Sequence, residues 1–224
     1  MAEKSSTSAA SHDAWTRPEF AKAALITIDV QRDTLDGQPF EIPGTTQALP
    51  QITALCEAFR QRSRPVLHVI RLYKPDGSNA ELCRREAIKN GETLFLAGSA
   101  GRLLADELLP KGAAEPDDQL LLNGHLQLIA PHEWYIYKSR WGAFYRTSLQ
   151  EHLLSLGVTT VVLAGCNYPN CIRATVYEAS ERDFRVVAIT DGISNFTEHG
   201  WNELRSIGVN VMGTRDCILA LDSK

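Results

Sequence analysis

Short, continuously apolar runs alternate along the chain with longer segments in which apolar residues recur every three or four positions. A strand with one face in water alternates in polarity, whereas a continuous apolar run is typical of a strand covered on both faces. The pattern therefore predicts buried strands, the last of them short, at residues 24–30, 65–70, 159–164, 185–190 and 210–212.

The segments between these runs have the spacing of amphipathic helices. Residues 46–62 carry Leu49, Ile52 and Phe59 on one helical face, and a second helix is predicted over residues 197–207. Strands that alternate with helices imply βαβ units and a parallel sheet. We predict an α/β fold: a three-layer α/β/α sandwich with a mostly parallel central sheet.

The stretch between residues 74 and 118 is rich in Gly and charged residues and follows neither pattern. We predict a helix and long loops there, over the carboxyl edge of the sheet, where α/β folds place their sites. The chain is long enough for one well-buried domain, which we place at residues 19–224. Residues 1–18 are predicted to be a disordered leader, because their Ser/Ala-rich start lacks the apolar core of a signal peptide.

Composition and charge limit the classes of partner that we expect and favour one cellular location. The chain of 224 residues has a formal net charge of −4 and a pI near 5.9, so we expect no nucleic-acid partner. No apolar run is long enough to cross a bilayer, so we expect no membrane partner. Five cysteines are an odd, sparse set, which favours reduced thiols and a cytoplasmic location.

The sharpest local signal is GCNYPNCIRATVYEASERDF, residues 165–184. A buried strand ends at its glycine, a turn containing proline follows, and a helix begins near Cys171. The macrodipole and free N–H groups of a helix N-terminus favour thiolate over thiol, which predicts a nucleophilic sulfur. The alternative is that Cys171 is a small buried hydrophobic residue. We interpret residues 178–183 as a solvated helix end.

Two charged residues stand at the ends of predicted strands. Asp29 closes the first apolar run, and Lys138 closes an aromatic strand over residues 134–137. A carboxylate in such an apolar setting needs partners, and Asp29 could be the general base for a nearby thiol. A structural carboxylate and a solvated lysine are the alternatives.

Together, these residues resemble the isochorismatase-like cysteine hydrolases, a superfamily that includes the nicotinamidases. The resemblance covers roughly residues 24–217 and rests on three motifs in order. They are an Asp-x-Gln after the first strand, a lysine followed by an aromatic residue and Thr-x-Leu, and a glycine separated by five residues from a helix-opening cysteine. The matching residues are Asp29, Gln31, Lys138, Phe144, Thr147, Leu149, Gly165, Cys171, Ala179 and Phe184.

The resemblance implies hydrolysis of a non-peptide C–N bond in a small molecule, whether amide, carbamoyl compound or imide. Asp29 would take the proton of Cys171, Lys138 would hold the aspartate in place, and the sulfur would form a thioester that water releases. The N–H groups of Asn167 and Cys171 would form the oxyanion hole, next to a cis peptide bond at Cys166–Asn167. Relatives commonly form dimers or tetramers, so we expect a homo-oligomer.

The region after the second strand departs from the nicotinamidases, which carry an aspartate and two histidines there as metal ligands. This chain has only His68, inside the strand, while His125 and His132 lie too far along the chain. We therefore expect no catalytic metal and no cofactor, and nicotinamide is a poor substrate candidate. By the same mapping the pocket candidates are Gln31, Arg71, Asp76, Trp141, Phe144 and Tyr168. Aromatic rings could stack on a flat substrate and Arg71 could pair with a carboxylate, or these residues could be core aromatics and a local salt bridge.

Two other functions on this fold stay open. Isochorismatases proper cleave a vinyl ether and commonly lack the cysteine, so Cys171 disfavours that reaction. A catalytically inactive protein that only binds a small molecule would have no need of an intact triad. Phosphatase-type chemistry would need an arginine where Tyr177 stands, and no Gly-x-Gly-x-x-Gly follows the first strand.

Overall fold

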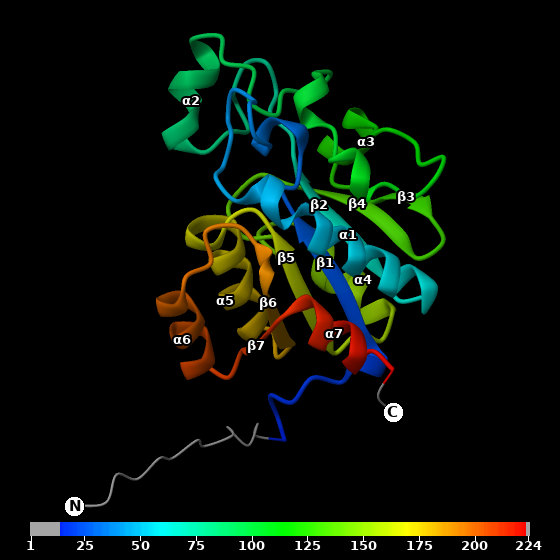
Figure 1. Cartoon of the computed structure of the whole chain (residues 1–224). Helices are drawn as coiled ribbons and strands as arrows, with labels where there is room; N and C mark the ends of the chain where they lie inside the picture. Colours follow the sequence, from blue (N-terminus) through cyan, green and yellow to red (C-terminus); the bar gives the residue numbers. More distant parts are fainter. Residues whose placement is uncertain (1–13, 223–224) are drawn as a thin grey trace, which may run out of the picture.

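A seven-stranded sheet forms the centre of the computed structural model, which describes residues 14–222 (Figure 1). The strand order is β3-β4-β2-β1-β5-β6-β7. All neighbouring strands are parallel except β3 and β4. The strands are β1 (Ala23–Ile28), β2 (Val66–Arg71), β3 (Gln127–Ala130), β4 (Glu133–Lys138), β5 (Thr160–Gly165), β6 (Arg185–Ile193) and β7 (Asn210–Met212).

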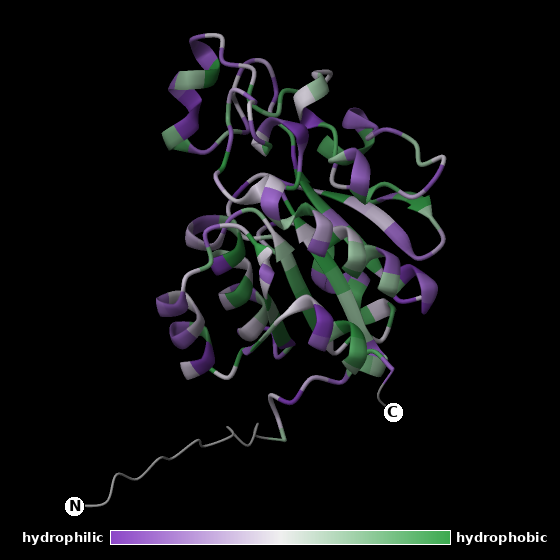
Figure 2. Cartoon of the chain, in the orientation of Figure 1, coloured by the Kyte–Doolittle hydropathy of each residue, from purple (hydrophilic) through white to green (hydrophobic). Residues whose placement is uncertain are grey.

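Helices cover both faces of this sheet, because the central strands are apolar on both sides. Leu55 of α1 and Cys217 of α7 belong to one core, and Leu153 of α4, Val176 of α5 and Leu204 of α6 belong to the other. Figure 2 shows the hydrophobic strands enclosed between helices whose outer surfaces are polar. The α-helices are α1 (Thr45–Gln61), α2 (Leu82–Lys89), α3 (Asp118–Leu122), α4 (Leu149–Ser155), α5 (Arg173–Ser180), α6 (Glu198–Ser206) and α7 (Thr214–Ala220), with 3₁₀ turns η1 (Phe20–Lys22), η2 (Arg32–Thr34), η3 (Ala100–Arg102) and η4 (Asp106–Leu108). Among residues 14–222, no helix is long and apolar enough to cross a membrane.

The three-layer α/β architecture and the predicted strands are confirmed, with strand ends that move by three residues or fewer. The helices predicted over residues 46–62 and 197–207 are α1 and α6, and the helix predicted to begin near Cys171 is α5. The apolar pattern does not predict β3, because this edge strand is only half buried and lacks a continuous apolar run. It also does not predict α4 or α7, which are each only seven residues long. The segment 74–118 lies at the carboxyl end of the sheet and contains α2, as expected (Figure 1).

The predicted disordered leader needs a correction at its end. Residues 1–13 lie outside the described part of the chain. Residues 14–18 are described, and the Asn210 side chain donates a 2.7 Å hydrogen bond to the carbonyl of Thr16. The contact attaches this segment to the start of β7, so the ordered domain begins before residue 19.

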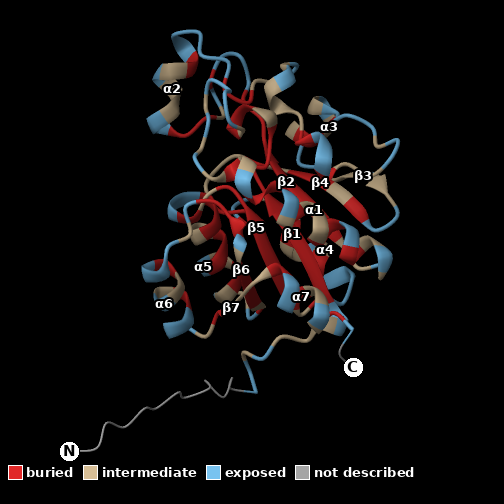
Figure 3. Cartoon of the chain, viewed as in Figure 1, coloured by how far each residue is buried: buried red, intermediate tan, exposed pale blue. Residues whose placement is uncertain are grey.

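A buried polar cluster connects α1 to the middle of the sheet, which is the most buried part of the molecule (Figure 3). Glu133 accepts two hydrogen bonds from the Arg60 guanidinium at 2.8 and 2.6 Å and lies 2.6 Å from His68 Nε2. The other ring nitrogen of His68 lies 2.7 Å from the hydroxyl of Thr27. Burial lowers the pKa of His68, so the imidazole is neutral and donates to Glu133.

We expect Glu133→Gln to lower the free energy of unfolding by roughly 2–4 kcal/mol, because Arg60 would lose its counter-charge in a largely buried site. Although burial opposes its charge, hydrogen bonds from Arg60 and His68 lower the pKa of Glu133 to about 2. The wild-type protein therefore keeps this stabilisation above the usual carboxyl pKa and loses it as pH falls toward the folded value. Urea unfolding at neutral and acidic pH should show a shallower acid decline for the variant. Glu86→Gln, at an exposed site on α2, is the control, and wild-type stability of Glu133→Gln at neutral pH would contradict the prediction.

Candidate active site

Four charged or nucleophilic side chains meet at the carboxyl edge of four neighbouring strands. Asp29 directly follows β1, Arg71 ends β2, Lys138 ends β4, and Cys171 lies beyond β5. Arg71 and Lys138 are direct register partners across β2 and β4, so their side chains lie side by side. Parallel strands direct all four to one edge of the sheet, which is the usual position of sites in this fold class.

The backbone around β1 and β5 brings Asp29 and Cys171 together. Asp29 has a φ of 51° and donates its N–H to the carbonyl of Val69, which fixes the turn that leaves β1. Gly165 has a φ of 120°, and a Cβ there would lie 2.4 Å from the carbonyl oxygen of Ile28. Only glycine therefore fits at this crossing of β5 and β1.

The chain then passes through a cis peptide bond between Cys166 and Asn167, at the position that the family resemblance implies. The next residues, Tyr168–Ile172, form a π-helical turn that leads into α5, and Cys171 lies in this turn. Within the described residues, the N–H of Asn167 donates no hydrogen bond, although Asn167 is half buried beside the sulfur.

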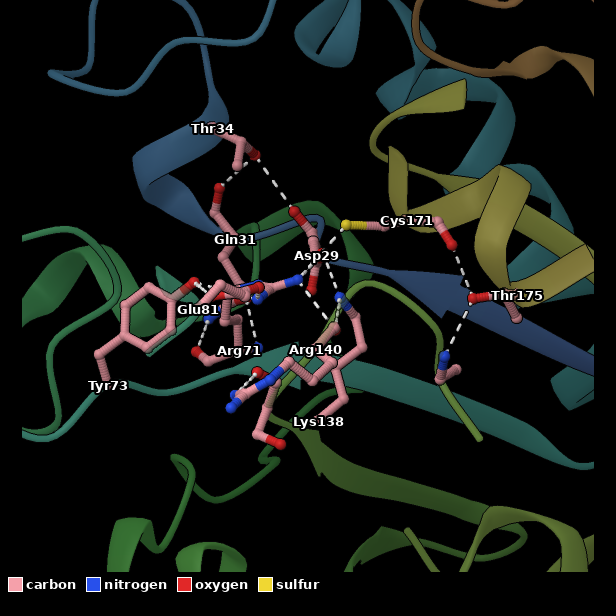
Figure 4. A network of polar contacts seen from close by, with 12 residues as sticks. Asp29, Gln31, Thr34, Arg71, Tyr73, Glu81, Lys138, Arg140, Cys171 and Thr175 are labelled. Carbon is pink, nitrogen blue, oxygen red and sulfur yellow. Dashed lines mark hydrogen bonds and ion pairs between the residues drawn. The ribbon is translucent and has the colours of Figure 1, made fainter. Parts of the chain in front are cut away.

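Only one carboxylate oxygen of Asp29 has a hydrogen-bond partner within the described residues (Figure 4). Its Oδ2 accepts a 2.7 Å hydrogen bond from Lys138 Nζ and lies 3.7 Å from Arg71 Nη2, whereas Oδ1 has no hydrogen-bond partner in residues 14–222. Burial disfavours the charged carboxylate, but the positive charges of Lys138 and Arg71 outweigh it and lower the pKa of Asp29. The result is a buried base that is free to accept a proton.

The surroundings of Cys171 favour the neutral thiol, whereas the helix N-terminus considered alone favours the thiolate. Its Sγ lies 3.5 Å from Arg71 Nη2, and its side chain is almost fully buried. Burial and the negative charge of Asp29 raise the pKa of the thiol, and the charges of Lys138 and Arg71 only partly oppose them.

A difference titration can test this protonation state. The ultraviolet absorbance of the thiolate, measured as wild type minus Cys171→Ser, should be absent at neutral pH. It should appear only above the ordinary thiol pKa of about 8.5. A thiolate signal already present at neutral pH would contradict the assignment, and exposed Cys83 cancels in the difference because both proteins contain it.

Arg71 belongs to a second, fully buried ion pair beside the thiol. Its Nη1 donates to Glu81 and, at 3.0 Å, to the hydroxyl of Tyr73, which in turn donates to Glu81 (Figure 4). Its Nη2 donates to the carbonyl of Arg140 at 3.0 Å, and Lys138 Nζ lies 3.2 Å from the same oxygen. Glu81 therefore fixes the guanidinium next to the sulfur and leaves little capacity for a substrate carboxylate.

The turn after Lys138 is held by α5. Thr175 accepts the N–H of Ala143 at 3.1 Å and donates to the carbonyl of Cys171 at 2.7 Å. Glu178 accepts the N–H of Phe144 at 2.8 Å, and a Cβ at Gly142 would collide with this carboxylate. Glu178 is thus a half-buried anchor of the turn, which corrects its assignment to a solvated helix end.

A small closed cavity adjoins the sulfur. Its volume is about 20 Å³, room for little more than a water molecule, and Asp29, Arg71, Arg84, Trp141, Asn167 and Cys171 line it. The structure therefore brings the predicted triad, the predicted oxyanion residues and two pocket candidates, Arg71 and Trp141, to one place.

Four other pocket candidates lie elsewhere and have structural contacts. The buried side-chain amide of Gln31 donates a hydrogen bond to the carbonyl of Arg71 and accepts one from the Arg71 N–H. Asp76 is exposed and accepts the N–H of Ser78. Phe144 packs on Phe184. Tyr168 stacks on Phe196, and its hydroxyl lies 3.2 Å from the Gly200 carbonyl and 3.1 Å from the Glu203 carboxylate, either of which can accept its proton. None of the Gln31, Asp76, Phe144 and Tyr168 side chains lines the cavity, so their contact with substrate stays a prediction.

Glu81 and Arg84 also belong to the site, although no sequence pattern indicates them. They lie at the start of α2, in the Gly-rich and charged region that has no clear periodicity. Their surroundings in sequence resemble an ordinary solvated helix, so only the position of α2 over the sheet edge distinguishes them.

The described residues do not fit a metal site of the nicotinamidase kind. Both ring nitrogens of His68 are hydrogen-bonded inside the sheet. No group of three or more His, Cys, Asp or Glu within residues 14–222 is arranged to hold a metal ion.

Comparison with known proteins gives one consistent family. The isochorismatase-domain family model matches residues 23–216. A probable inactive nicotinamidase of Arabidopsis thaliana is 32% identical over 193 residues, covering 83% of this chain and 89% of that protein. The maleamate amidohydrolase of Pseudomonas putida is 28% identical over 177 residues, covering 78% of this chain and 73% of that protein. The crystal structure of an isochorismatase family protein from Desulfovibrio vulgaris matches with a TM-score of 0.76 at 32% identity, covering 89% of this chain and 98% of its own.

Proposed function

The chain belongs to the isochorismatase family, and from this premise we propose that it is a cysteine hydrolase that cleaves a non-peptide C–N bond of a small molecule through a thioester. One observation carries the proposal: the Cys171 thiol and the Asp29 carboxylate share a buried cationic partner. Cys171 Sγ and Asp29 Oδ2 lie 3.5 and 3.7 Å from the same nitrogen, Arg71 Nη2. Such an arrangement suits proton transfer from sulfur to carboxylate at the moment of attack.

In the first half of the reaction, the thiol proton moves to Asp29 as Sγ forms a bond to the substrate carbonyl carbon. The carbonyl oxygen becomes an oxyanion, and the unbonded N–H of Asn167 is well placed to donate to it together with the N–H of Cys171. The C–N bond then breaks, and Asp29 returns the proton to the departing nitrogen, which leaves as ammonia or an amine.

In the second half, water attacks the thioester and gives a proton to Asp29. The C–S bond breaks, the acid product leaves, and the proton returns to sulfur. The positive charges of Lys138 and Arg71 favour the ionised form of Asp29 whenever it acts as the base. No oxidant, reductant or cofactor is needed for this cycle.

The test is a mass-spectrometric screen of the protein against small amides, carbamoyl compounds and imides, with vinyl ethers in the same library. We expect a hydrolysed product together with an acyl adduct on the Cys171 peptide after an acid quench. A product from a vinyl ether without any adduct would instead support isochorismatase-type chemistry. Absence of product and adduct over the whole library would count against the hydrolase and favour a protein that only binds its ligand.

A further inference from the structure

We propose that Arg84, resting on the ring of Trp141, is a binding site for a substrate carboxylate. The inference rests on the proposed function and narrows it: the substrate is a small amide or ureido compound that carries a carboxylate. Arg84 would pair with that group while the amide carbonyl reaches Cys171.

Arg84 lies beside the cavity at Cys171. Arg84 is in the first turn of α2 and lines the cavity that Cys171 also lines. Its guanidinium carbon lies 5.4 Å from the centre of the Trp141 ring, and that of Arg71 lies 5.2 Å from the same centre. Trp141 therefore contacts two guanidinium groups, that of Arg71 beside the sulfur and that of Arg84 from the first turn of α2.

The ion pairs around the cavity leave one cation without an anionic partner within residues 14–222. Lys138 pairs with Asp29, and Arg71 pairs with Glu81. Within residues 14–222, the Arg84 side chain makes no ion pair and no hydrogen bond. The cavity thus has one cation more than it has anions, and an anionic substrate would balance it, whereas a neutral one would leave Arg84 unpaired.

The neighbouring Arg71 and Arg140 are less suited than Arg84 to bind a substrate carboxylate. Glu81 and Tyr73 already occupy Arg71. Arg140 donates to the carbonyls of Asn79 and Ser139 and does not line the cavity. The Arg84 guanidinium stacks on an aromatic face and keeps its donor edge free, which is the geometry that recognises a planar carboxylate through two parallel hydrogen bonds.

Two alkylating agents of nearly equal size, anionic iodoacetate and neutral iodoacetamide, can test the site without knowledge of the substrate. The rate of reaction at Cys171 is measured for each by peptide mass spectrometry, which separates it from exposed Cys83. Opening of the closed cavity affects both reagents alike, so it cancels in the ratio of the two rates. We expect Arg84→Gln to lower the iodoacetate-to-iodoacetamide ratio by roughly tenfold or more, as for loss of a charge-assisted hydrogen bond.

Lys89→Gln is the matched control, because it removes the same charge from the exposed end of the same helix and should leave the ratio unchanged. An equal ratio in wild type and Arg84→Gln would overturn the carboxylate site and leave Cys171 as the nucleophile. An equal fall in Lys89→Gln would also overturn it, since the effect would then come from the overall charge of α2. Absence of reaction at Cys171 with both reagents would overturn the proposed function and the carboxylate site with it.

Discussion

Cys171→Ala should abolish turnover, with a loss of at least about 10⁴-fold in kcat for any substrate that the wild type hydrolyses. In the proposed mechanism the sulfur forms the bond that replaces the C–N bond, so neither Asp29 nor Lys138 can compensate for its absence. The change removes one buried atom, and the rest of the site keeps its ion pairs. We therefore expect the variant to remain folded, and product formation to fall to the level of the protein-free reaction.

Cys171→Ser is the companion variant for this experiment. It keeps a proton donor of similar shape beside Asp29, but a hydroxyl is far harder to deprotonate than a thiol, so it should also be inactive. Thermal unfolding of both variants should resemble that of the wild type, which separates a chemical defect from misfolding. Turnover that persists in Cys171→Ala would remove the cysteine as nucleophile and favour the vinyl-ether reaction.

Asp29→Asn should have the second largest effect, because it removes the base and also a buried counter-charge. An amide cannot take the thiol proton, so we expect kcat to fall by roughly 10³- to 10⁴-fold. Lys138 is fully buried, and its ammonium would lose its partner. Breaking a buried pair in this way should lower the free energy of unfolding by about 3–5 kcal/mol.

The pH dependence identifies the source of that stability loss. The pKa of Asp29 is lower in the folded protein, so its contribution is complete above the usual carboxyl pKa of about 4 and is lost as pH falls through the folded value. The difference between wild type and Asp29→Asn in urea unfolding should therefore shrink in acid. Asp222→Asn, which affects only an exposed pair with Arg62, should change neither activity nor stability appreciably. Wild-type activity of Asp29→Asn would contradict its role as base.

The amino-acid sequence alone predicts the layers of the fold and the three residues of the proposed triad. Continuous apolar runs fix β1, β2, β5 and β6, because a strand buried on both faces has no polar positions to place in water. Asp29, Lys138 and Cys171 each end or follow such a run, and their order and spacing match the isochorismatase family. These are local features, which adjacent residues suffice to specify.

The electrostatic surroundings of these residues, and the further residues of the site, follow from the three-dimensional packing. The pKa of the Cys171 thiol is raised because strands distant in sequence bury it beside Asp29, an influence that a helix N-terminus considered alone does not reveal. Arg71 is paired internally because α2 brings Glu81 to it, and Arg84 faces the cavity through the position of the same helix. Burial and Coulomb interactions depend on distances between segments far apart in the chain, and sequence patterns do not encode these distances directly.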